Sequence, residues 1–331
     1  MLNDKTILVT GGTGSFGHHF VDNVLKHYSP KKIIIYSRDE YKQFVMDQEY
    51  REYRDRLRYF IGDVRDESRL KMAMKDVDYV IHAAALKQVP ACEYNPNEAI
   101  KTNINGAMNV INASLEKKVK KVIALSTDKA VNPVNLYGGT KLVSDKLFCA
   151  ANAYGGFDGT KFAVVRYGNV AGSRGSVIPF FQSIIEQGGT ELPITDYRMT
   201  RFWISLEQGV ELVIKALEES RGGETFISKI PSFKITDLAQ AMLPGCNMPE
   251  VGIREGEKLH EIMVTREDSL YTYEYEKHFI VYPHYNWWGE KDVIPGGELV
   301  KAEFEYSSGI NTEWLGVNDL KKKIRTDLDQ H

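Results

Sequence analysis

A tyrosine and a lysine four residues apart are the best candidates in this sequence for acid–base chemistry. Tyr137 and Lys141 belong to the segment Tyr-Gly-Gly-Thr-Lys, and residues at this spacing share one face of a helix. A phenol with its ordinary pKa of about 10 is a poor base at neutral pH. A nearby ammonium stabilises the phenolate and lowers that pKa. Thr127, ten residues before the tyrosine, could hold a reacting hydroxyl by a hydrogen bond.

A glycine-rich segment near the N-terminus could hold a phosphate group. Its glycines, three residues apart, stand between an apolar run and a helical pattern. The first permits a tight turn, the second lets the backbone approach a pyrophosphate, and the third lets helix and strand pack closely. The following helix offers its N–H groups and positive dipole end to the anion. We expect a dinucleotide to be bound by Gly11, Thr13, Gly14, Ser15, Phe16 and Gly17.

The elements that would position these groups alternate along the first half of the chain. Short β-branched runs predict buried strands, and helical spacing fills the stretches between them. Right-handed crossovers then give a doubly wound parallel sheet of the α/β class, an extended Rossmann fold, with ligands at the carboxyl ends of its strands. The predicted strands are Thr6–Thr10, Ile33–Tyr36, Arg58–Ile61, Tyr79–Ala83, Val122–Leu125 and Phe162–Val165, and a long helix is predicted over Pro96–Lys118.

The pattern weakens after about residue 172, which indicates a smaller second lobe. The remaining chain is rich in Tyr, Trp, Gly and Pro, and we expect it to hold a substrate. The predicted domains are a dinucleotide-binding domain over 1–170, to which 203–230 returns, and a C-terminal substrate lobe formed by 171–202 and 231–331.

The end of the second strand favours NADP over NAD. An acid there would bind the 2′-hydroxyl of the adenosine ribose, but Ser37 takes that place and Arg38 follows, which suits a 2′-phosphate. Lys42 could add a cation, whereas Asp39 keeps NAD possible. Asp63, after the third strand, could accept a hydrogen bond from the adenine amino group. Further cofactor contacts are expected from Val64, Ala83, Ala85, Tyr137 and Lys141.

Composition narrows the class of protein. The net charge of -3 over 331 residues gives no general affinity for nucleic acid. No run of about 18 apolar residues predicts a membrane span, and the N-terminus lacks the apolar stretch of a signal peptide. The three cysteines are far apart and form neither a metal-ligand spacing nor a disulfide framework. We therefore expect a cytoplasmic protein with reduced thiols and no metal site.

In combination, the glycine loop and the Tyr-x-x-x-Lys pattern resemble those of the extended short-chain dehydrogenase/reductase family. Narrower motifs over nearly the whole chain resemble the inverting UDP-N-acetylglucosamine 4,6-dehydratases. Retaining sugar-nucleotide dehydratases commonly carry Asp-Glu where this chain has Asp128-Lys129, and larger membrane-bound relatives carry Met in place of Tyr137. The motifs that carry the resemblance are Tyr36–Glu40, Ala83–Pro90, Ser126–Ala130, Arg166–Val170, Gly172–Val177, Met199–Phe202 and Gly256–Glu261.

This resemblance implies an NADP-dependent hydro-lyase that acts on UDP-N-acetylglucosamine. Tyr137 would take the proton of the sugar 4-hydroxyl, Lys129 the proton of carbon 5, and Asp128 would protonate the departing 6-hydroxyl. Hydride taken from carbon 4 would return to carbon 6. A proton entering carbon 5 from the opposite face would give UDP-2-acetamido-2,6-dideoxy-β-L-arabino-hex-4-ulose, in the first step of pseudaminic acid or related bacterial surface-sugar synthesis.

These roles require unusual protonation states. Lys129 must be neutral, so we expect its pKa to be lowered by burial or by cations such as Lys141, and Asp128 must be protonated. The alternative is that Asp128 and Lys129 form a simple ion pair.

Substrate contacts are expected from arginines and from the loops after the fourth and sixth strands. Arg174 and Arg201 are the best candidates to bind the diphosphate, because a guanidinium pairs with phosphate oxygens bidentately. Lys87 could reach cofactor or sugar, and the resemblance places Asn169 beside the nicotinamide. The resemblance also implies a homo-oligomer, with a hexamer possible. The further expected contacts are Gly175, Ser176, Val177 and Arg254 for substrate and Val170 for cofactor.

Other functions stay open at this point. A 4-epimerase would use the same tyrosine and lysine without the Asp128-Lys129 pair, and a retaining 4,6-dehydratase is a second enzyme alternative. A non-catalytic NADP-sensing protein belongs to a different class. The intact set of Thr127, Tyr137 and Lys141 argues against it, because a sensor has no use for that set.

Overall fold

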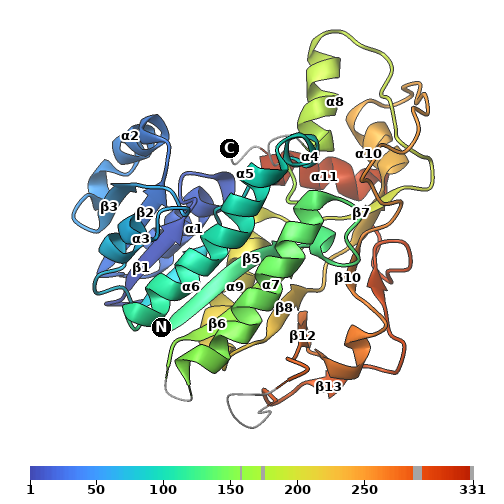
Figure 1. The fold of residues 1–331 in the computed structure, drawn as a ribbon. Helices are drawn as coiled ribbons and strands as arrows, with labels where there is room; N and C mark the ends of the chain where they lie inside the picture. Colours follow the sequence, from blue (N-terminus) through green and yellow to red (C-terminus); the bar gives the residue numbers. More distant parts are fainter. Residues whose placement is uncertain (157–158, 173–175, 286–292, 329–331) are drawn as a thin grey trace.

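A large mixed sheet forms the centre of the molecule (Figure 1). The computed structural model describes residues 1–156, 159–172, 176–285 and 293–328. Within them the strand order is β13-β11-β12-β8-β6-β5-β4-β1-β2-β3. Pairing from β3 to β8 is parallel, and β12, β11 and β13 continue antiparallel. The strands are β1 (Thr6–Thr10), β2 (Lys32–Ser37), β3 (Leu57–Ile61), β4 (Tyr79–His82), β5 (Lys121–Thr127), β6 (Lys161–Tyr167), β8 (Thr225–Ser228), β11 (Thr272–Glu274), β12 (His278–Val281) and β13 (Glu298–Leu299).

The parallel strands bury both of their faces. Successive side chains point to opposite sides of a sheet, so in β1 Ile7 and Val9 join one core while Leu8 joins the other. The isoleucines of β2 divide in the same way. Two apolar faces explain why these strands appear in the sequence as unbroken hydrophobic runs. The predicted doubly wound α/β sheet is confirmed.

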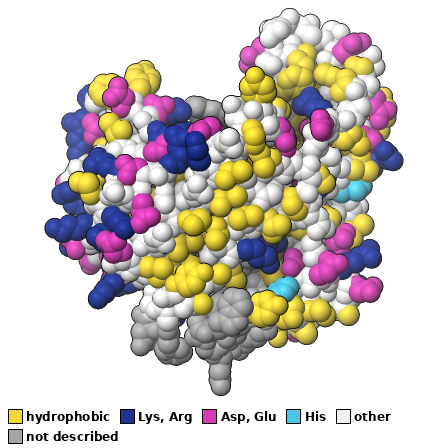
Figure 2. Space-filling view, in the orientation of Figure 1, with side chains coloured by type: hydrophobic (Ala, Val, Ile, Leu, Met, Phe, Trp, Pro, Cys, Tyr) yellow, Lys and Arg dark blue, Asp and Glu magenta, His cyan; other side chains and the backbone are white. Residues whose placement is uncertain are grey.

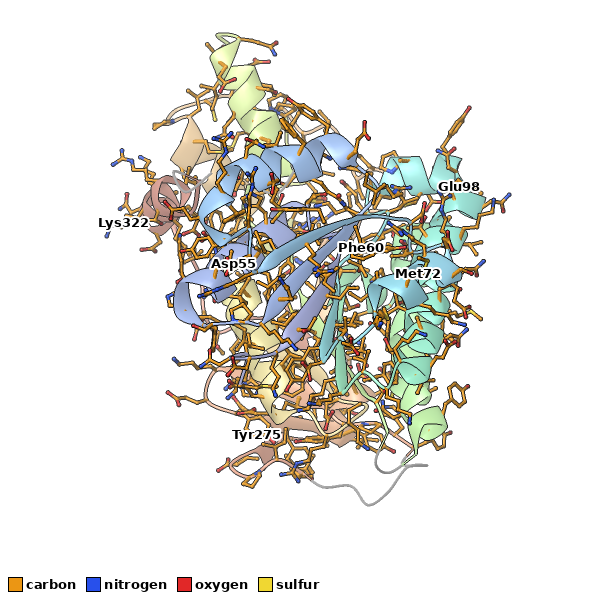
Figure 3. The ribbon with its side chains drawn as sticks, turned by 90° about the vertical axis from the view of Figure 1, so that its left-hand side faces the viewer. Asp55, Phe60, Met72, Glu98, Tyr275 and Lys322 are labelled. Carbon is orange, nitrogen blue, oxygen red and sulfur yellow. The ribbon has the colours of Figure 1, made fainter. Side chains whose placement is uncertain are left out.

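Helices cover the two faces. α1 packs against α9 on one face, and α3, α6 and α7 lie side by side on the other (Figure 1). Figure 3 looks onto the β3 edge, where Phe60 packs under the guanidinium of Arg69 from α3. The helices of this part are α1 (Ser15–His27), α2 (Glu40–Glu49), η1 (Arg51–Tyr53), α3 (Glu67–Ala73), α4 (Val89–Tyr94), α5 (Pro96–Ile100), α6 (Gly106–Glu116), η3 (Asp128–Ala130), α7 (Leu136–Gly155) and α9 (Leu206–Glu219).

The single long helix expected over Pro96–Lys118 is interrupted. A π-helical turn, η2 (Lys101–Asn105), separates α5 from α6. Asn103 in this turn is buried, accepts a hydrogen bond from the Leu86 N–H at 2.8 Å and donates to the Leu86 carbonyl at 2.9 Å. It also donates to Thr140 Oγ1 at 3.0 Å. One amide therefore ties the segment after β4 to α7.

A smaller lobe stands beside the carboxyl ends of the parallel strands (Figure 1). A third apolar core, which includes Phe181, Trp203 and Leu238, holds it together. Its strands form two small antiparallel pairs, β7 with β9 and β10 with β14. The elements beyond the main sheet are α8 (Val177–Glu186), β7 (Thr200–Phe202), β9 (Ser232–Lys234), α10 (Ile235–Met242), β10 (Ile262–Val264), η4 (Asp268–Tyr271), β14 (Tyr306–Ser307) and α11 (Val317–Leu328).

The boundary of this lobe differs from the expected one. β8 and α9, within 203–230, lie in the main layers, but so do β11, β12 and β13 from the stretch 231–331. β12 pairs antiparallel along β8, with His278 opposite Ser228 and Val281 opposite Thr225. The second lobe is therefore smaller than the sequence suggested, because part of that stretch covers the edge of the main sheet.

The described surface carries apolar side chains over α6 and α7 (Figure 2). Met108, Val143 and Tyr154 are among the exposed ones. Within the same residues, no helix combines the length and apolar character that crossing a membrane requires.

Candidate active site

One cleft of about 1510 Å³ collects the carboxyl ends of the parallel strands and faces the second lobe. Figure 2 shows the molecule hollowed between the part that carries α2 and the part that carries α8. Every predicted site residue in the described part of the chain lines this cleft except Asp128, whose side chain is fully buried. Arg174 and Gly175 lie outside the described residues. The cleft is where a doubly wound sheet binds its ligands.

The loop between β1 and α1 is shaped for close approach of a ligand. Gly11 has a φ of +66°, and a Cβ there would stand 3.0 Å from the backbone of Ala84. A Cβ at Gly17 would stand 2.5 Å from Gly12, so only glycine lets α1 start so close to the loop. Gly14 caps α1 without a side-chain hydrogen bond, which leaves the helix N-terminus to an anion.

Charged side chains at the ends of β2 and β3 differ in how many hydrogen bonds and ion pairs they form with the rest of the protein. Asp39 caps α2 by accepting from the Lys42 N–H at 3.0 Å, and its carboxylate lies 3.2 Å from the Lys42 ammonium. Asp63 accepts two hydrogen bonds from the Arg65 guanidinium at 2.7 and 2.9 Å. Arg38 lines the cleft with its side chain 57% exposed, 3.8 Å from Asp63. The guanidinium is thus more available to a ligand than either carboxylate.

Ser37 lines the cleft and also supports the local fold. Its side chain is buried and accepts a hydrogen bond from the Gln43 amide at 3.0 Å. The same amide also binds the Ser37 and Phe60 carbonyls at 3.1 and 2.9 Å. These contacts fix the turn from which Arg38 projects.

Tyr137, Lys141 and Thr127 all line the cleft, and Tyr137 forms a hydrogen bond with Thr127. The first turn of α7 is capped by Asn135, which accepts from the Gly138 N–H at 2.8 Å and so fixes the helix start. Burial raises the pKa of Tyr137 to about 12, opposed by the charge of Lys129 and by a hydrogen bond with Thr127. Burial also lowers the pKa of Lys141, which Asp145 counteracts. Among the charges around the phenol, that of Lys129 acts to lower its pKa.

A glycine joins Tyr137 to the segment that follows β5. A Cβ at Gly138 would lie 2.1 Å from the Lys129 carbonyl oxygen, whereas a Cβ at Gly139 would meet nothing within 4 Å. α7 therefore packs directly against the backbone of η3. This contact holds the phenol, the amine and the Thr127 hydroxyl in one place.

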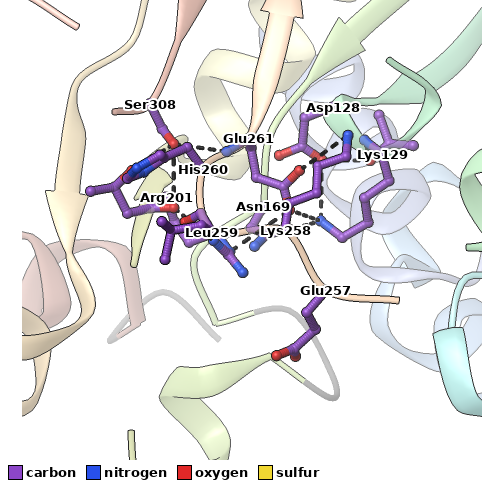
Figure 4. A network of polar contacts seen from close by, with 12 residues as sticks. Asp128, Lys129, Asn169, Arg201, Glu257, Lys258, Leu259, His260, Glu261 and Ser308 are labelled. Carbon is purple, nitrogen blue, oxygen red and sulfur yellow. Dashed lines mark hydrogen bonds and ion pairs between the residues drawn. The ribbon is translucent and has the colours of Figure 1, made fainter. Parts of the chain in front are cut away.

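Asp128, Lys129, Asn169 and Glu261 form a polar cluster at the side of the cleft (Figure 4). The Lys129 ammonium lies 3.2 Å from Asp128 Oδ1 and 3.3 Å from Glu261 Oε1, and it donates to Asn169 Oδ1 at 2.9 Å. Thr127 Oγ1 donates to Asp128 Oδ1 at 2.9 Å. The Lys129 amine thus contacts two carboxyl groups beside the tyrosine.

The protonation states in this cluster differ in part from the expectation. Burial raises the pKa of Asp128, and the charge of Glu261 raises it further, as an acid requires. Burial alone would lower the pKa of Lys129, but Asp128 and Glu261 outweigh it and the pKa is raised. The expected lowering is therefore wrong for this arrangement, because two carboxylates flank the amine.

The candidate diphosphate ligands stand in contrasting surroundings. Arg201 is buried, donates to the carbonyls of Thr200 at 2.7 Å and Leu259 at 3.2 Å, and lies 3.8 Å from Glu261. Arg254 has a side chain 64% exposed. Both line the cleft, together with Lys87, Val170, Ser176 and Val177.

Two charged residues of the site were not predicted to have a role. Glu261 and Lys258 reach the cluster from the segment before β10, and the two side chains approach within 3.9 Å. They belong to the Gly256–Glu261 motif, so the signal was present in the sequence, but nothing local showed which of its charges would face Lys129. Within the described residues, no group of acidic, His or Cys side chains is arranged to hold a metal.

Comparison with known proteins identifies close relatives. The chain is 57% identical over 331 residues to a protein of Campylobacter jejuni (strain 81-176) named UDP-N-acetylglucosamine 4,6-dehydratase (inverting), with 97% of each chain covered. It is 42% identical over 341 residues to a protein of Rickettsia akari named UDP-glucose 4-epimerase, with 98% and 97% covered. Among solved structures, Pen from Bacillus thuringiensis matches with a TM-score of 0.88 and 38% identity over 98% of this chain and 99% of that one.

The family pattern described as polysaccharide biosynthesis protein matches residues 7–283, which includes the glycine loop, the Tyr-x-x-x-Lys pair and the Glu261 segment. The chain therefore belongs to this polysaccharide biosynthesis family of extended short-chain dehydrogenases/reductases.

Proposed function

We propose that this protein is a UDP-N-acetylglucosamine 4,6-dehydratase that inverts carbon 5, a hydro-lyase. The observation that carries the proposal is the cluster in which Asp128 and Lys129 touch each other beside Tyr137. A 4-epimerase has no use for this additional acid and base. The Campylobacter relative, at 57% identity over nearly the full chain, bears the name of that activity.

The glycine loop fits a dinucleotide, and we propose NADP. Gly11 and Gly17 leave no room for a Cβ, and Gly14 leaves the start of α1 to an anion, which forms a cradle for a pyrophosphate. Arg38 faces the cleft and supports binding of a 2′-phosphate, whereas Asp39 is held by α2. When bound, the nicotinamide supplies the acceptor for hydride from carbon 4 and the donor that returns it to carbon 6. The residues proposed to hold the cofactor are Gly11, Thr13, Gly14, Ser15, Phe16, Gly17, Ser37, Arg38, Lys42, Asp63, Val64, Ala83, Ala85, Lys87 and Val170.

Tyr137 acts as the base that takes the proton of the 4-hydroxyl. Its pKa of about 12 in the protein alone is too high for this role at neutral pH. That pKa already includes the effect of the Lys129 charge, and the positive charge of an oxidised nicotinamide would lower it further. Thr127 orients the sugar hydroxyl, and Lys141 places a further cation one helical turn away. The 4-ketone so formed acidifies the proton on carbon 5.

Asp128 and Lys129 then remove water across carbons 5 and 6. One proton passed from Lys129 to Asp128 across their 3.2 Å contact leaves a neutral amine and a carboxylic acid, the base and acid that the step requires. The amine takes the carbon 5 proton, the acid protonates the 6-hydroxyl, and water leaves. Return of hydride to carbon 6 and of a proton to the other face of carbon 5 gives the inverted 4-keto-6-deoxy sugar of a bacterial surface-polysaccharide pathway.

The diphosphate of the substrate is proposed to meet arginines at the second lobe. Arg201 lines the cleft at a fixed position, and the exposed Arg254 can follow a ligand. Asn169 already binds Lys129 and so places the amine toward the sugar. Lys87, Arg174, Gly175, Ser176 and Val177 are the further proposed substrate contacts.

A second candidate is a 4-epimerase, because Rickettsia relatives at about 42% identity carry that name. Product analysis separates the two activities, since an epimerase retains the 6-hydroxyl. The protein is incubated with UDP-N-acetylglucosamine in heavy water and the product examined by NMR. A methyl group at carbon 6, deuterium at carbon 5 and L configuration are expected. An intact 6-hydroxymethyl group would exclude dehydration, and D configuration at carbon 5 would indicate a retaining enzyme.

We also propose that the protein is a homo-oligomer. The exposed apolar side chains of α6 and α7, with Tyr154 74% exposed, support a protein–protein contact on that face. Light scattering after size exclusion should give a mass of at least two chains. A single-chain mass across the concentrations used for assay would exclude the oligomer.

A further inference from the structure

Glu261 is a buried acid from the second lobe that lies in the polar cluster with Asp128, Lys129 and Asn169. Its side chain is only 3% exposed. Its N–H donates to Ser308 Oγ at 2.9 Å, and its carbonyl accepts from the Ser308 N–H at 2.8 Å. These two bonds from the segment after β14 hold the backbone on both sides of the residue. Glu261 is thus placed by the second lobe, whereas Lys129 is placed by the main sheet.

Three cations surround the carboxylate (Figure 4). Lys129 lies 3.3 Å and Arg201 3.8 Å from Oε1, and Lys258 lies 3.9 Å from Oε2. Oε2 is buried and accepts no hydrogen bond from the described residues. An ionised carboxylate is costly to bury unless charges compensate it. This acid therefore stays ionised at the wall of the cleft because of its cationic neighbours.

The three cations are not equivalent. Arg201 is anchored by two backbone carbonyls, and Lys258 by the carbonyl of Val131. The contacts of Lys129 are instead Asp128, Asn169 and Glu261, all in the cluster itself. Removing the Glu261 charge would leave Arg201 and Lys258 with backbone partners, but it would release Lys129 on the side that faces the second lobe.

We infer that Glu261 is a positioning residue for the elimination step: it holds the Lys129 nitrogen at carbon 5 and keeps the shared proton on the Asp128–Lys129 pair. This inference rests on the proposed function and adds to it a residue that acts on one of its two stages. Tyr137 and the dinucleotide loop serve the oxidation at carbon 4. Glu261 serves the removal of water that follows.

The charge of Glu261 also sets the pH range of that step. The elimination needs one proton on the pair, which is lost at high pH and joined by a second at low pH. The charged and titratable groups that face this pair are Glu261, Arg201, Lys258, Tyr137 and Lys87. Glu261 raises the pKa of both Asp128 and Lys129. Removing its charge should therefore move both limbs of the pH profile to lower pH.

The test compares Glu261→Gln with Glu261→Asp and with Glu267→Gln as a matched control. Glu267 is exposed, lies six residues further along the same segment and stands away from the cleft. Single-turnover absorbance reports the oxidation at carbon 4, and formation of the 4-keto-6-deoxy product reports the elimination. Glu261→Gln should slow elimination about 100-fold, as expected for a misplaced group, so that reduced nicotinamide accumulates. Its elimination profile should move down by about one pH unit or more.

The control and the aspartate variant sharpen this result. Glu267→Gln should match the unmodified protein in both stages. Glu261→Asp keeps the charge but shortens the side chain, so its pH profile should stay near that of the unmodified protein while its rate falls. Equal slowing of both stages by Glu261→Gln, with an unshifted profile, would assign the residue a purely structural role. Unchanged elimination in that variant would overturn the inference.

A substrate-free measurement separates this inference from the proposed function. If the unmodified protein makes no 4-keto-6-deoxy sugar, the function fails. NMR titration of ¹³C-labelled lysine, with Lys129 assigned through Lys129→Ala, still reports its contact with Glu261. The Lys129 signal should titrate at lower pH in Glu261→Gln than in the unmodified protein. An identical titration in both would show that Glu261 does not act on Lys129.

Discussion

The cleft is built in two different ways at its two ends. At the dinucleotide end, contacts come from short segments that each follow a parallel strand, and those of the glycine loop are shaped by backbone geometry. At the Glu261 end, buried charged side chains come from η3, β7 and the segment before β10. Binding of a cofactor is thus supported by local geometry, whereas the elimination depends on side chains held from two lobes.

Tyr137 lies between the dinucleotide end and the Glu261 end of the cleft. We expect Tyr137→Phe to lower the reaction rate more than any other substitution described below. Without the hydroxyl no proton leaves the sugar 4-hydroxyl, so transient reduction of the nicotinamide should fall by about 10³-fold or more. Stopped-flow absorbance measures it. Tyr94→Phe, which changes an exposed tyrosine of α4 that does not line the cleft, is the matched control and should behave like the unmodified protein. Normal reduction in Tyr137→Phe would refute the assigned role.

Lys129→Ala should impair only the elimination step, which depends on the Glu261 end of the cleft. Oxidation at carbon 4 should continue, while deuterium incorporation at carbon 5 from heavy water should drop by about 100-fold or more, because the base is missing. NMR of the recovered sugar reports the exchange. Lys75→Ala removes an exposed lysine remote from the cleft and should change neither stage. Exchange at the full rate in Lys129→Ala would show that another group is the base.

Arg38→Ala should alter the dinucleotide end alone. Loss of a charged hydrogen-bonding partner for the 2′-phosphate costs about 1.5–3 kcal/mol, or roughly 10- to 100-fold in the Kd for NADP. The Kd for NAD should change little, and calorimetry of both dinucleotides gives the ratio. Arg51→Ala, which removes an exposed arginine bound to Gln48, is the control. A parallel loss for NADP and NAD would contradict recognition of the 2′-phosphate by Arg38.

The packing of α7 on η3, which joins the two ends of the cleft, can be tested by measuring the free energy of unfolding. A Cβ at position 138 meets the Lys129 carbonyl at 2.1 Å, so Gly138→Ala should lower the free energy of unfolding by about 1–3 kcal/mol. Gly139→Ala adds a methyl to open space in a helix and should raise it by about 0.5–1 kcal/mol. Urea unfolding compares the two. Equal effects would mean that α7 does not pack on η3 as described.

The contrast between the two ends of the cleft also explains which features could be predicted from the sequence and which could not. The strands, the glycine loop and the Tyr137–Lys141 pair follow from spacing between neighbouring residues, and the loop and the pair line one cleft. The pairing of β12 with β8 and the approach of Glu261 to Lys129 join residues far apart in the chain. The pKa of Lys129 was mispredicted because the charges of Asp128 and Glu261, the second of which comes from the other lobe, together outweigh the effect of burial.

The π-helical turn before α6 has a consequence for how this protein can vary. Deleting one residue there would restore a regular helix, but it would rotate every later side chain of α6 by about 100° relative to α5. It would also turn the Asn103 amide away from both Leu86 and Thr140, and the two segments it fastens would part. Surface positions of this helix can therefore change in type, while the number of residues from Pro96 to Glu116 is held fixed.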